Sequence, residues 1–176
     1  LGNRASYGGG IYFQHFENVI IKNSSFINNF VNDNGGGNDH GGGIAGQRGE
    51  TLIIMHTLFS YNKVPYRGAG VYGEGIKMVT ILFSKFTRNY ASSKGGGIHV
   101  NQIHGFHNIK NIFVSNTAKR DGAAIAIIYT YVISNIIDSL FLNNLESIYR
   151  RGVVAYHHAT RRGKVAFIRS VFIDMK

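Results

Sequence analysis

The chain contains one short motif, Phe-x-x-Asn, five times at nearly regular intervals. Six phenylalanines share one phase of this repeat, and the first five of them begin the motif. The phenylalanines are Phe26, Phe59, Phe86, Phe113, Phe141 and Phe172. The asparagines that close the motif are Asn29, Asn62, Asn89, Asn116 and Asn144. Self-similarity at a fixed spacing indicates a tandem array in which each repeat is one structural unit.

A glycine-rich triplet precedes each of the first four phenylalanines and is followed by an aliphatic residue fifteen positions before the Phe. The triplets are residues 8–10, 41–43, 68–70 and 95–97, with degenerate copies at 122–125 and 152–155. Their ends are 33, 27, 27, 27 and 30 residues apart, and a glycine-rich insertion at 34–39, predicted to be a surface loop, accounts for the longer first interval. Because the triplets lack bulk, we expect left-handed backbone and close approach of chain layers at a tight corner before a strand.

The segments between the glycines are rich in Ile, Val, Phe and Tyr, which is typical of short strands, as at 17–22 and 78–83. No stretch keeps the apolar spacing of an amphipathic helix without a Gly or Asn interrupting it. The sequence therefore predicts an all-β protein, a parallel β-helix (β-solenoid) of about six coils. The coils would start near residues 8, 41, 68, 95, 122 and 152 and form one domain over 1–176. Stacking at the inter-strand spacing gives a rod roughly 29 Å long.

Equal offsets from the Phe define columns along such a rod. Five residues before the Phe the column is mostly apolar and is predicted to form an inward wall: Ile21, Ile54, Ile81, Asn108, Ile136 and Phe167. Two residues before the Phe it is small and polar: Ser24, Thr57, Ser84, Asn111, Ser139 and Ser170. Polar side chains can face inward only when they are hydrogen-bonded. We expect the Phe and aliphatic columns to form the dry core, and the Asn and Ser columns to fix the turns through ladders of hydrogen bonds.

The alternation of Phe-x-x-Asn with Gly-Gly-(Gly/Ala)-Ile resembles the repeat of the polymorphic outer membrane protein family, over about residues 8 to 174. The resemblance implies a right-handed parallel β-helix at the cell surface or outside the cell, used in adhesion or assembly, with no catalytic residues to transfer. The pattern departs from the family at Met175, where Asn is expected, and at Val153-Val154, where glycine is expected. These departures indicate a modified sixth turn, such as a cap or an interface.

Composition adds few constraints. Nineteen Lys and Arg against nine Asp and Glu give a formal net charge of +10, which favours an anionic partner such as acidic glycan, nucleic acid or phospholipid headgroups. The absence of cysteine excludes disulfides and thiolate metal sites. No apolar run approaches the roughly 20 residues that span a bilayer, so no transmembrane segment is expected. The chain starts Leu1-Gly2-Asn3 without an initiator Met or a signal-like stretch, so we expect a processed or excised portion.

One column offers candidate catalytic residues. Glu17, Glu50, Lys77 and His104 lie at equal offsets on consecutive turns. Two carboxylates one turn apart would be near the separation of about 5 to 5.5 Å that retaining glycosidases use. A carbohydrate-active enzyme, either a glycoside hydrolase or a polysaccharide lyase, is therefore an alternative, with Glu17 and Glu50 as acid and nucleophile. Weak surface pairing of these charges is the competing interpretation, and no enzymatic activity is our expectation.

The histidines do not predict a metal site. His99, His104 and His107 fall within one turn, and His157-His158 lie two turns further on. Side chains at odd and even offsets of a strand point to opposite faces, so three imidazoles would not converge on zinc. No metal and no other cofactor is expected.

A second column is basic. His40, Arg67, Lys94 and Arg151 stand immediately before glycine triplets, with Arg120 one place earlier in its turn, and Tyr66 and Tyr149 on the same strip. This predicts a cationic stripe, which is either a polyanion-binding surface for acidic glycan or a charged edge that blocks sideways association. Nucleic acid is disfavoured because no recognised reading module is present.

The ends of a β-solenoid are open edges that invite pairing. The chain finishes in strand-like sequence at 171–176, without an evident cap. We therefore expect end-to-end self-association or continuation in a longer chain, and a structural role as a cell-surface or extracellular rod, filament or adhesive face. Asn23-Ser24-Ser25 is a formal glycosylation acceptor whose occupancy the sequence leaves open.

Overall fold

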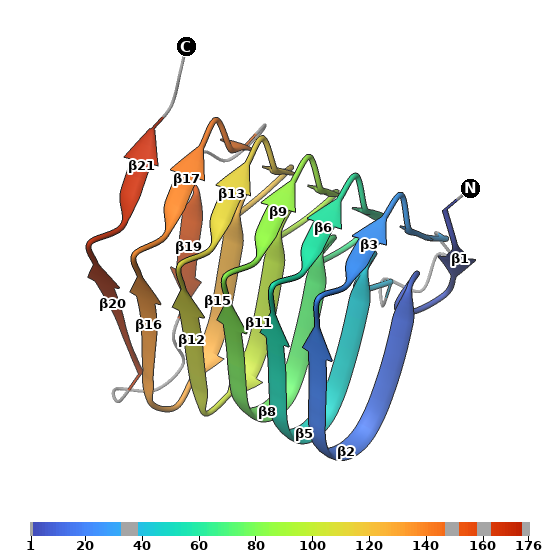
Figure 1. The fold of residues 1–176 in the computed structure, drawn as a ribbon, viewed down its shortest axis with the longest axis horizontal. Coiled ribbons are helices and arrows are strands. Elements are labelled where there is room, and N and C mark those ends of the chain that lie inside the picture. The colour runs from blue at the N-terminus through green and yellow to red at the C-terminus, as the bar shows by residue number, and fades with distance from the viewer. Residues whose placement is uncertain (1, 33–38, 147–151, 158–162, 174–176) are drawn as a thin grey trace.

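The computed structural model describes residues 2–32, 39–146, 152–157 and 163–173, which form strands and turns and no helix. All strand pairs are parallel, and each joins one coil to the next. Three sheets run the length of a rod, as Figure 1 shows from the blue first coil to the red last one. The prediction of an all-β, parallel β-solenoid of about six turns is confirmed.

The sheets differ in strand length. The long sheet has nine strands, β2 (Ile11–Lys22), β5 (Ile44–Met55), β8 (Val71–Leu82), β11 (Ile98–Ile103), β12 (Gly105–Ile109), β15 (Ile125–Thr130), β16 (Ile133–Ile137), β19 (Val154–His157) and β20 (Lys164–Ile168). The Phe sheet has six, β3 (Ser25–Ile27), β6 (Leu58–Ser60), β9 (Lys85–Thr87), β13 (Ile112–Val114), β17 (Leu140–Leu142) and β21 (Val171–Ile173). The short sheet has six, β1 (Arg4–Ala5), β4 (Phe30–Val31), β7 (Lys63–Val64), β10 (Tyr90–Ala91), β14 (Thr117–Ala118) and β18 (Leu145–Glu146).

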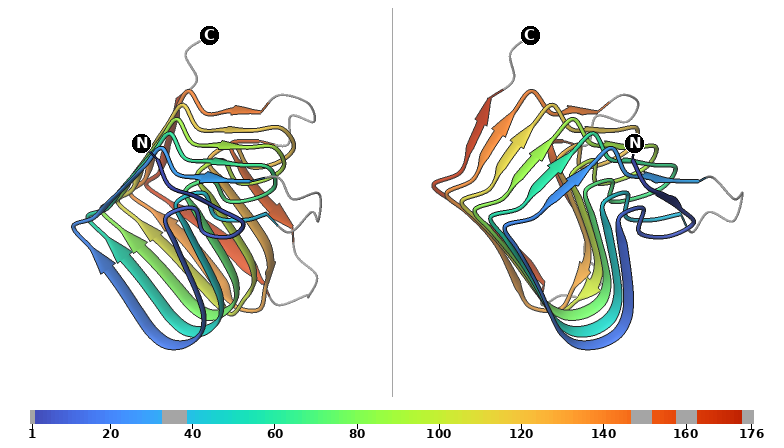
Figure 2. Two further views of the ribbon diagram at one scale, coloured as in Figure 1. Left: turned by 90° about the vertical axis from the view of Figure 1, so that its right-hand side faces the viewer. Right: turned by 45° about the vertical axis from the view of Figure 1, so that its right-hand side comes forward.

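Each coil passes through the sheets in the same order. The chain runs along the long sheet, which bends halfway, then along the Phe sheet, then along the short sheet, and returns through the glycine triplet (Figure 2). In the first three coils one 12-residue strand follows the whole bend, whereas later coils break into two strands there. Successive coils therefore place equivalent residues side by side on every face.

The phenylalanine rings form one continuous stack inside the rod. Rings of successive coils have centroids 4.5 to 5.1 Å apart and planes tilted by only 3 to 8°. The stack runs from Phe26 to Phe172, and Phe59, Phe86 and Phe113 are fully buried. The predicted vertical registry of the Phe column is confirmed, including its sixth member.

The asparagines form the predicted ladder, and its central members, Asn62, Asn89 and Asn116, share one bonding pattern. The Nδ2 of Asn89 donates to the Oδ1 of Asn116 at 2.9 Å and to the carbonyl oxygen of Phe59 at 3.0 Å. Its Oδ1 in turn accepts from both the backbone N–H and the Nδ2 of Asn62. Because every polar atom of the buried amide is used, the column costs little desolvation energy and fixes the register between coils.

The ladder extends one coil further than the motif. Asn3 donates from Nδ2 to the Oδ1 of Asn29 at 3.1 Å, and β1 pairs with β4 as later short strands do. Residues 3–5 thus occupy the short-sheet position of a coil before the first. The Phe-x-x-Asn motif does not indicate Asn3, because the position of its Phe lies before Leu1.

The small polar column also behaves as predicted. The hydroxyl of Ser84 donates to the carbonyl of Leu82 in its own coil and accepts from the backbone N–H of Thr57 in the preceding coil. Asn108, the polar exception in the apolar column, is fully buried and exchanges hydrogen bonds with Asn111 and Ser139. The inward wall is otherwise apolar, and its last member, Phe167, is half exposed on the final coil.

The corners of the coil are made by left-handed residues, and most of them carry side chains. Among the described residues, fifteen that are not glycine have φ between 46 and 56°, and they fall into three columns. At the bend of the long sheet they are His15, Arg48, Gln102 and Tyr129, with Gly75 as the remaining member. Between the long and Phe sheets they are Asn23, His56, Phe83, Lys110, Asp138 and Arg169. Between the Phe and short sheets they are Asn28, Tyr61, Arg88, Ser115 and Asn143.

Within the glycine triplet only the first residue is left-handed, for example Gly41 and Gly68 with φ of 68 and 65°. The third residue is small for a different reason. A Cβ on Gly70 would lie 2.5 Å from the carbonyl oxygen of Gly97 and 2.9 Å from the ring of Phe86. The glycine triplet and the Phe stack therefore depend on each other, because the absence of a side chain on the third glycine makes room for the Phe ring.

The sixth coil keeps the pairing but not the predicted register. Val154 pairs with Ile125 and Ala155 with Ala126, so the aliphatic position belongs to Val154 rather than Ala155. Gly152 still has a positive φ, but one residue fewer separates it from the strand than in the coil above. A degenerate triplet of bulky residues gave no sequence signal for this deletion.

Candidate functional site

The bend of the long sheet carries a shallow groove with a cavity volume of about 420 Å³. Its side chains come from the left-handed corner and from the column of candidate catalytic residues. The lining residues are Arg48, Gly49, Glu50, Gly75, Lys77, Gln102, His104 and Tyr131. Gly75 leaves the depression because its neighbours in the column, Arg48 and Gln102, carry long side chains. We call this the bend groove.

The bend groove brings together three of the four candidate catalytic residues. Glu50, Lys77 and His104 line it, whereas Glu17, beside Glu50 in the register, does not. The Glu50 carboxylate is paired with the Lys77 ammonium at 2.6 Å, and both side chains are more than half exposed. The predicted arrangement of two carboxylates facing one cleft is therefore not found in this groove.

The histidines are dispersed. His99 is fully buried and stacks on the ring of Tyr72, His104 packs against the ring of Tyr131 at the bend, and His107 contacts the amide of Asn135. Among the described residues no three His, Cys, Asp or Glu side chains are grouped so that they could hold a metal ion. His158 lies outside the described residues.

The predicted cationic stripe is only partly correct. His40, Arg67 and Lys94 do pair from coil to coil, but the next position is Asp121, and Arg120 is exposed outside the column. The Lys94 ammonium lies 2.8 Å from the Asp121 carboxylate, which is 4% exposed. The stripe is therefore largely buried and partly neutralised, because the chain returns to the long sheet here and packs against its outer face. Arg151 and Tyr149 lie outside the described residues.

His40 is the most perturbed group in this column. Its ring is 5% exposed and stacks on Tyr72 with centroids 4.0 Å apart. Burial, together with the smaller effect of the neighbouring Arg67 guanidinium, lowers the pKa of His40 to about 3. Beside it, the Glu74 carboxylate accepts hydrogen bonds from the amides of Gln47 and Asn101. This cluster holds polar groups in place against the outer face of the long sheet.

A different surface gathers exposed cations. Residues of the short sheet and its preceding corner alternate between basic and aromatic along the rod: Arg4, Phe30, Tyr61, Lys63, Arg88 and Tyr90. We call this the cation–aromatic face. The Lys63 ammonium lies 5.9 Å from the Phe30 ring centre and 5.5 Å from that of Tyr90. Arg88 stacks over Tyr61 at 5.3 Å and donates a hydrogen bond to its hydroxyl.

The repeat pattern of the sequence does not indicate the cation–aromatic face, because its residues come from the short sheet and the corner before it and differ from coil to coil. One signal could have indicated it. No acidic residue occurs between Glu74 and Asp121, a stretch that contains seven Lys and Arg. Aligning this stretch with the preceding coil would have placed Arg88 beside Tyr61.

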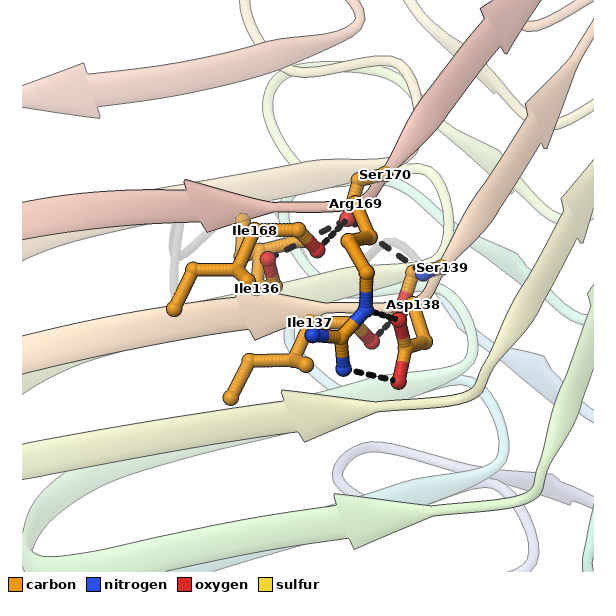
Figure 3. A network of polar contacts seen from close by, with 7 residues as sticks. All are labelled: Ile136, Ile137, Asp138, Ser139, Ile168, Arg169 and Ser170. Atoms are coloured by element: carbon orange, nitrogen blue, oxygen red, sulfur yellow. Dashed lines mark hydrogen bonds and ion pairs between the residues drawn. The ribbon is translucent and has the colours of Figure 1, made fainter.

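At the last corner between the long and Phe sheets, one exposed cation is paired with a carboxylate. Arg169 makes two hydrogen bonds to the Asp138 carboxylate, at 2.6 and 2.9 Å, while Ser170 bonds to the backbone of Ile136 and Ile168 (Figure 3). The hydrogen bonds from Arg169 hold the pKa of Asp138 below its ordinary value.

Comparisons of the chain with protein-family models, with curated proteins and with solved structures found no significant match. No helix in the described part of the chain is long and apolar enough to cross a membrane. The geometry of the rod and its side faces is therefore the basis for the functional proposals that follow.

Proposed function

We propose that this chain is a structural rod, a cell-surface or extracellular β-solenoid that stacks end to end and presents an adhesive side face. The observation that carries the proposal is the continuity of the inner ladders. Phe, Asn and Ser columns connect every coil to the next. The interior side chains therefore serve to hold successive coils together. The resemblance to polymorphic outer membrane proteins, with their right-handed β-helix, supports the same role.

The final coil exposes core surface. Phe167 and Phe172 pack edge to face on the last coil and are 50% and 47% exposed. A cavity of 110 Å³ lies beside them, lined by Phe141, Asn144, Val153, Phe172 and Ile173. Apolar surface of this kind at a free strand edge favours a further coil of the same geometry.

We propose a second copy of the chain as the occupant, because the two ends are complementary. The described short sheet runs one coil further at the N-terminal end, where β1 is the edge strand, and the Phe sheet runs one coil further at the C-terminal end. Placed head to tail, β21 would pair with β3 of the next copy, and Phe172 would stack on Phe26. Such a contact is heterologous and extends into a filament. In a longer polypeptide, further coils would take the same positions.

The geometry of the bend groove supports a role in recognition without turnover. The Glu50 carboxylate is paired with the Lys77 ammonium, and Glu17 is not among the residues that line the groove. A retaining glycosidase needs two carboxylates on either side of one bond.

Sedimentation velocity over a range of protein concentrations, with electron microscopy of the same samples, tests the assembly. We expect species that lengthen with concentration, and rods of constant width in the images. Phe167→Lys should abolish this lengthening, because it places a charge in the contact while altering a residue that is half exposed in the single chain.

The matched control is Ile112→Lys, which also replaces a partly exposed apolar residue by lysine, but on the side of the rod. Its neighbour in the column is Lys85, so the position tolerates lysine. This variant should assemble normally. Isolated short rods of the unmodified protein at high concentration would refute end-to-end stacking.

A further inference from the structure

We propose that the cation–aromatic face binds a linear acidic polysaccharide, one that carries sulfate or carboxylate groups along its length. This inference rests on the adhesive role proposed above and names both the surface and the class of ligand. It replaces the buried column around His40 and Lys94 as the polyanion site.

The first argument is charge. Within the described residues, carboxylates neutralise Lys77, Lys94 and Arg169. No described carboxylate pairs with Arg4, Lys63 or Arg88, and all three side chains are exposed. They are neighbours in space because the coil register places β1, β4, β7 and β10 side by side. The face therefore has a positive field that an anionic ligand would offset.

The second argument is preorganisation. Long basic side chains lose conformational freedom when they bind, and this loss weakens binding. Here the rings of Phe30, Tyr61 and Tyr90 already hold the cations in rows through cation–π contacts. The guanidinium of Arg88 is further fixed by its hydrogen bond to Tyr61. Part of the ordering cost is therefore met before a ligand arrives.

The third argument is shape. A depression with a cavity volume of about 570 Å³ lies at the N-terminal end of the face. It is lined by Gly2, Arg4, Asn28, Asn29, Phe30, Tyr61 and Lys63. Asn28 is exposed there and offers an amide for sugar hydroxyls. The depression continues into the exposed row of Lys63 and Arg88, so a chain lying along the rod would meet successive cations.

The arrangement favours a glycan over a nucleic acid. Proteins that hold single strands stack successive bases on open aromatic rings. In this face Lys63 lies between the Phe30 and Tyr90 rings, and Arg88 lies over Tyr61. The ring faces are thus used by cations, which leaves the cations to recognise sulfate or carboxylate oxygens.

Retention on immobilised heparin, a sulfated polysaccharide, at increasing salt tests the inference. We expect the unmodified protein to bind, and the triple variant Arg4→Gln, Lys63→Thr and Arg88→Asn to lose affinity by at least about tenfold, since several charge-assisted contacts disappear. Two of the replacements come from the protein itself. Thr117 occupies the column of Lys63, and Asn143 occupies the left-handed column of Arg88.

The matched control removes three exposed positive charges outside this face and outside the bend groove, with Lys22→Gln, Lys110→Asn and Lys164→Gln. Asn23 already occupies the left-handed column of Lys110, so this change is compatible with the corner. The control should keep the affinity of the unmodified protein. Circular dichroism and thermal unfolding establish that both triple variants are folded.

Three results would overturn the inference: no retention of the unmodified protein, unchanged retention of the first triple variant, or equal loss in the control, which would indicate net charge alone. A single-stranded oligonucleotide that displaces heparin more effectively than free heparin would assign the face to nucleic acid instead. The assay uses protein at concentrations too low for end-to-end contact, so its outcome is independent of the sedimentation experiment.

Discussion

At the scale of single residues, His40 shows what burial does to a titratable group. The ring lies between the aromatic side chains of Tyr66 and Tyr72, and its Nδ1 has no hydrogen-bond partner. Ala45 pairs with Tyr12 and Tyr72 in the outer column and is the small residue at that level, which leaves room for an imidazole. The neutral form of His40 is therefore the form that the fold accepts.

Folding stability should consequently fall as the solution is acidified. The pKa of His40 is about 3 in the folded protein and 6.5 in the unfolded chain. Between these values the unfolded chain binds one more proton, so the free energy of unfolding decreases with falling pH by up to about 1.4 kcal/mol per pH unit. His40→Phe keeps a stacking ring and removes the titration, and should reduce the slope of unfolding free energy against pH from 6.5 to 4.

Urea denaturation at several pH values measures that slope. His56→Phe is the control, because His56 is exposed in a left-handed corner where Phe83 occupies the next coil. This variant shows how much of any change in the slope comes from exchanging an exposed imidazole for a phenyl ring. Equal slopes for the unmodified protein and His40→Phe would contradict the prediction.

At the scale of the coil, the third glycine of the triplet and the Phe ring depend on one another. Gly70→Ala would place a methyl group 2.5 Å from a backbone oxygen of the next coil and 2.9 Å from Phe86. Neither can move without disturbing the stack, so we expect a loss of about 1 to 3 kcal/mol in the free energy of unfolding. Chemical denaturation provides the measurement.

Gly75→Gln is the informative comparison for this prediction. Gly75 is left-handed, but the nearest atoms to an added Cβ are 3.8 Å away, and Gln102 occupies the same column in the next coil. The cost should therefore be smaller than that of Gly70→Ala, although the replacement side chain is larger. The reverse order would show that the backbone angle, rather than the close approach, governs glycine in this fold.

The inner part of each coil could be predicted from the sequence because it repeats. The Phe and Asn columns follow one spacing, and the small polar column must be hydrogen-bonded when it is buried. The corners could not be predicted, because residues such as Phe83 and Tyr61 carry no sequence signal for a left-handed backbone. There the fold imposes the conformation, and the local preference is overridden.

The candidate surfaces were harder to predict for the same reason. The equal offsets of Glu50, Lys77 and His104 correctly placed them together, but the groove depends on the absence of a side chain at Gly75. The basic stripe was expected on an exposed edge, yet the return of the chain buries His40 and sets Asp121 beside Lys94. Whether an outer column is buried depends on the path of the whole coil, and the spacing of its residues in the sequence does not reveal that path.

At the scale of the whole molecule, the rod is a one-dimensional stack in which each coil contacts only its neighbours. A central coil should therefore contribute more to stability than a terminal one. Phe86 has stacking partners on both sides, whereas Phe172 has Phe141 on one side only and is 47% exposed. We expect Phe86→Ala to cost about 3 to 5 kcal/mol, as other buried aromatic truncations do, and Phe172→Ala clearly less.

Equilibrium unfolding in guanidinium, at protein concentrations below assembly, compares the two variants directly. Equal losses would mean that the terminal coil is as tightly packed as the centre. Repeating the measurement at high concentration links it to filament formation, because Phe172→Ala should become more costly once a second copy covers that ring.

The three left-handed corners have a consequence for how such a rod could diversify. Each corner side chain sits on a fixed backbone at the solvent boundary, and residues as different as His, Phe, Lys and Asp already occupy the same one. Replacing a corner residue therefore changes the outer chemistry of one coil without editing the interior. Substitution of single corner residues, which lie at multiples of one strand spacing along the rod, can therefore create new recognition surfaces on an unchanged scaffold.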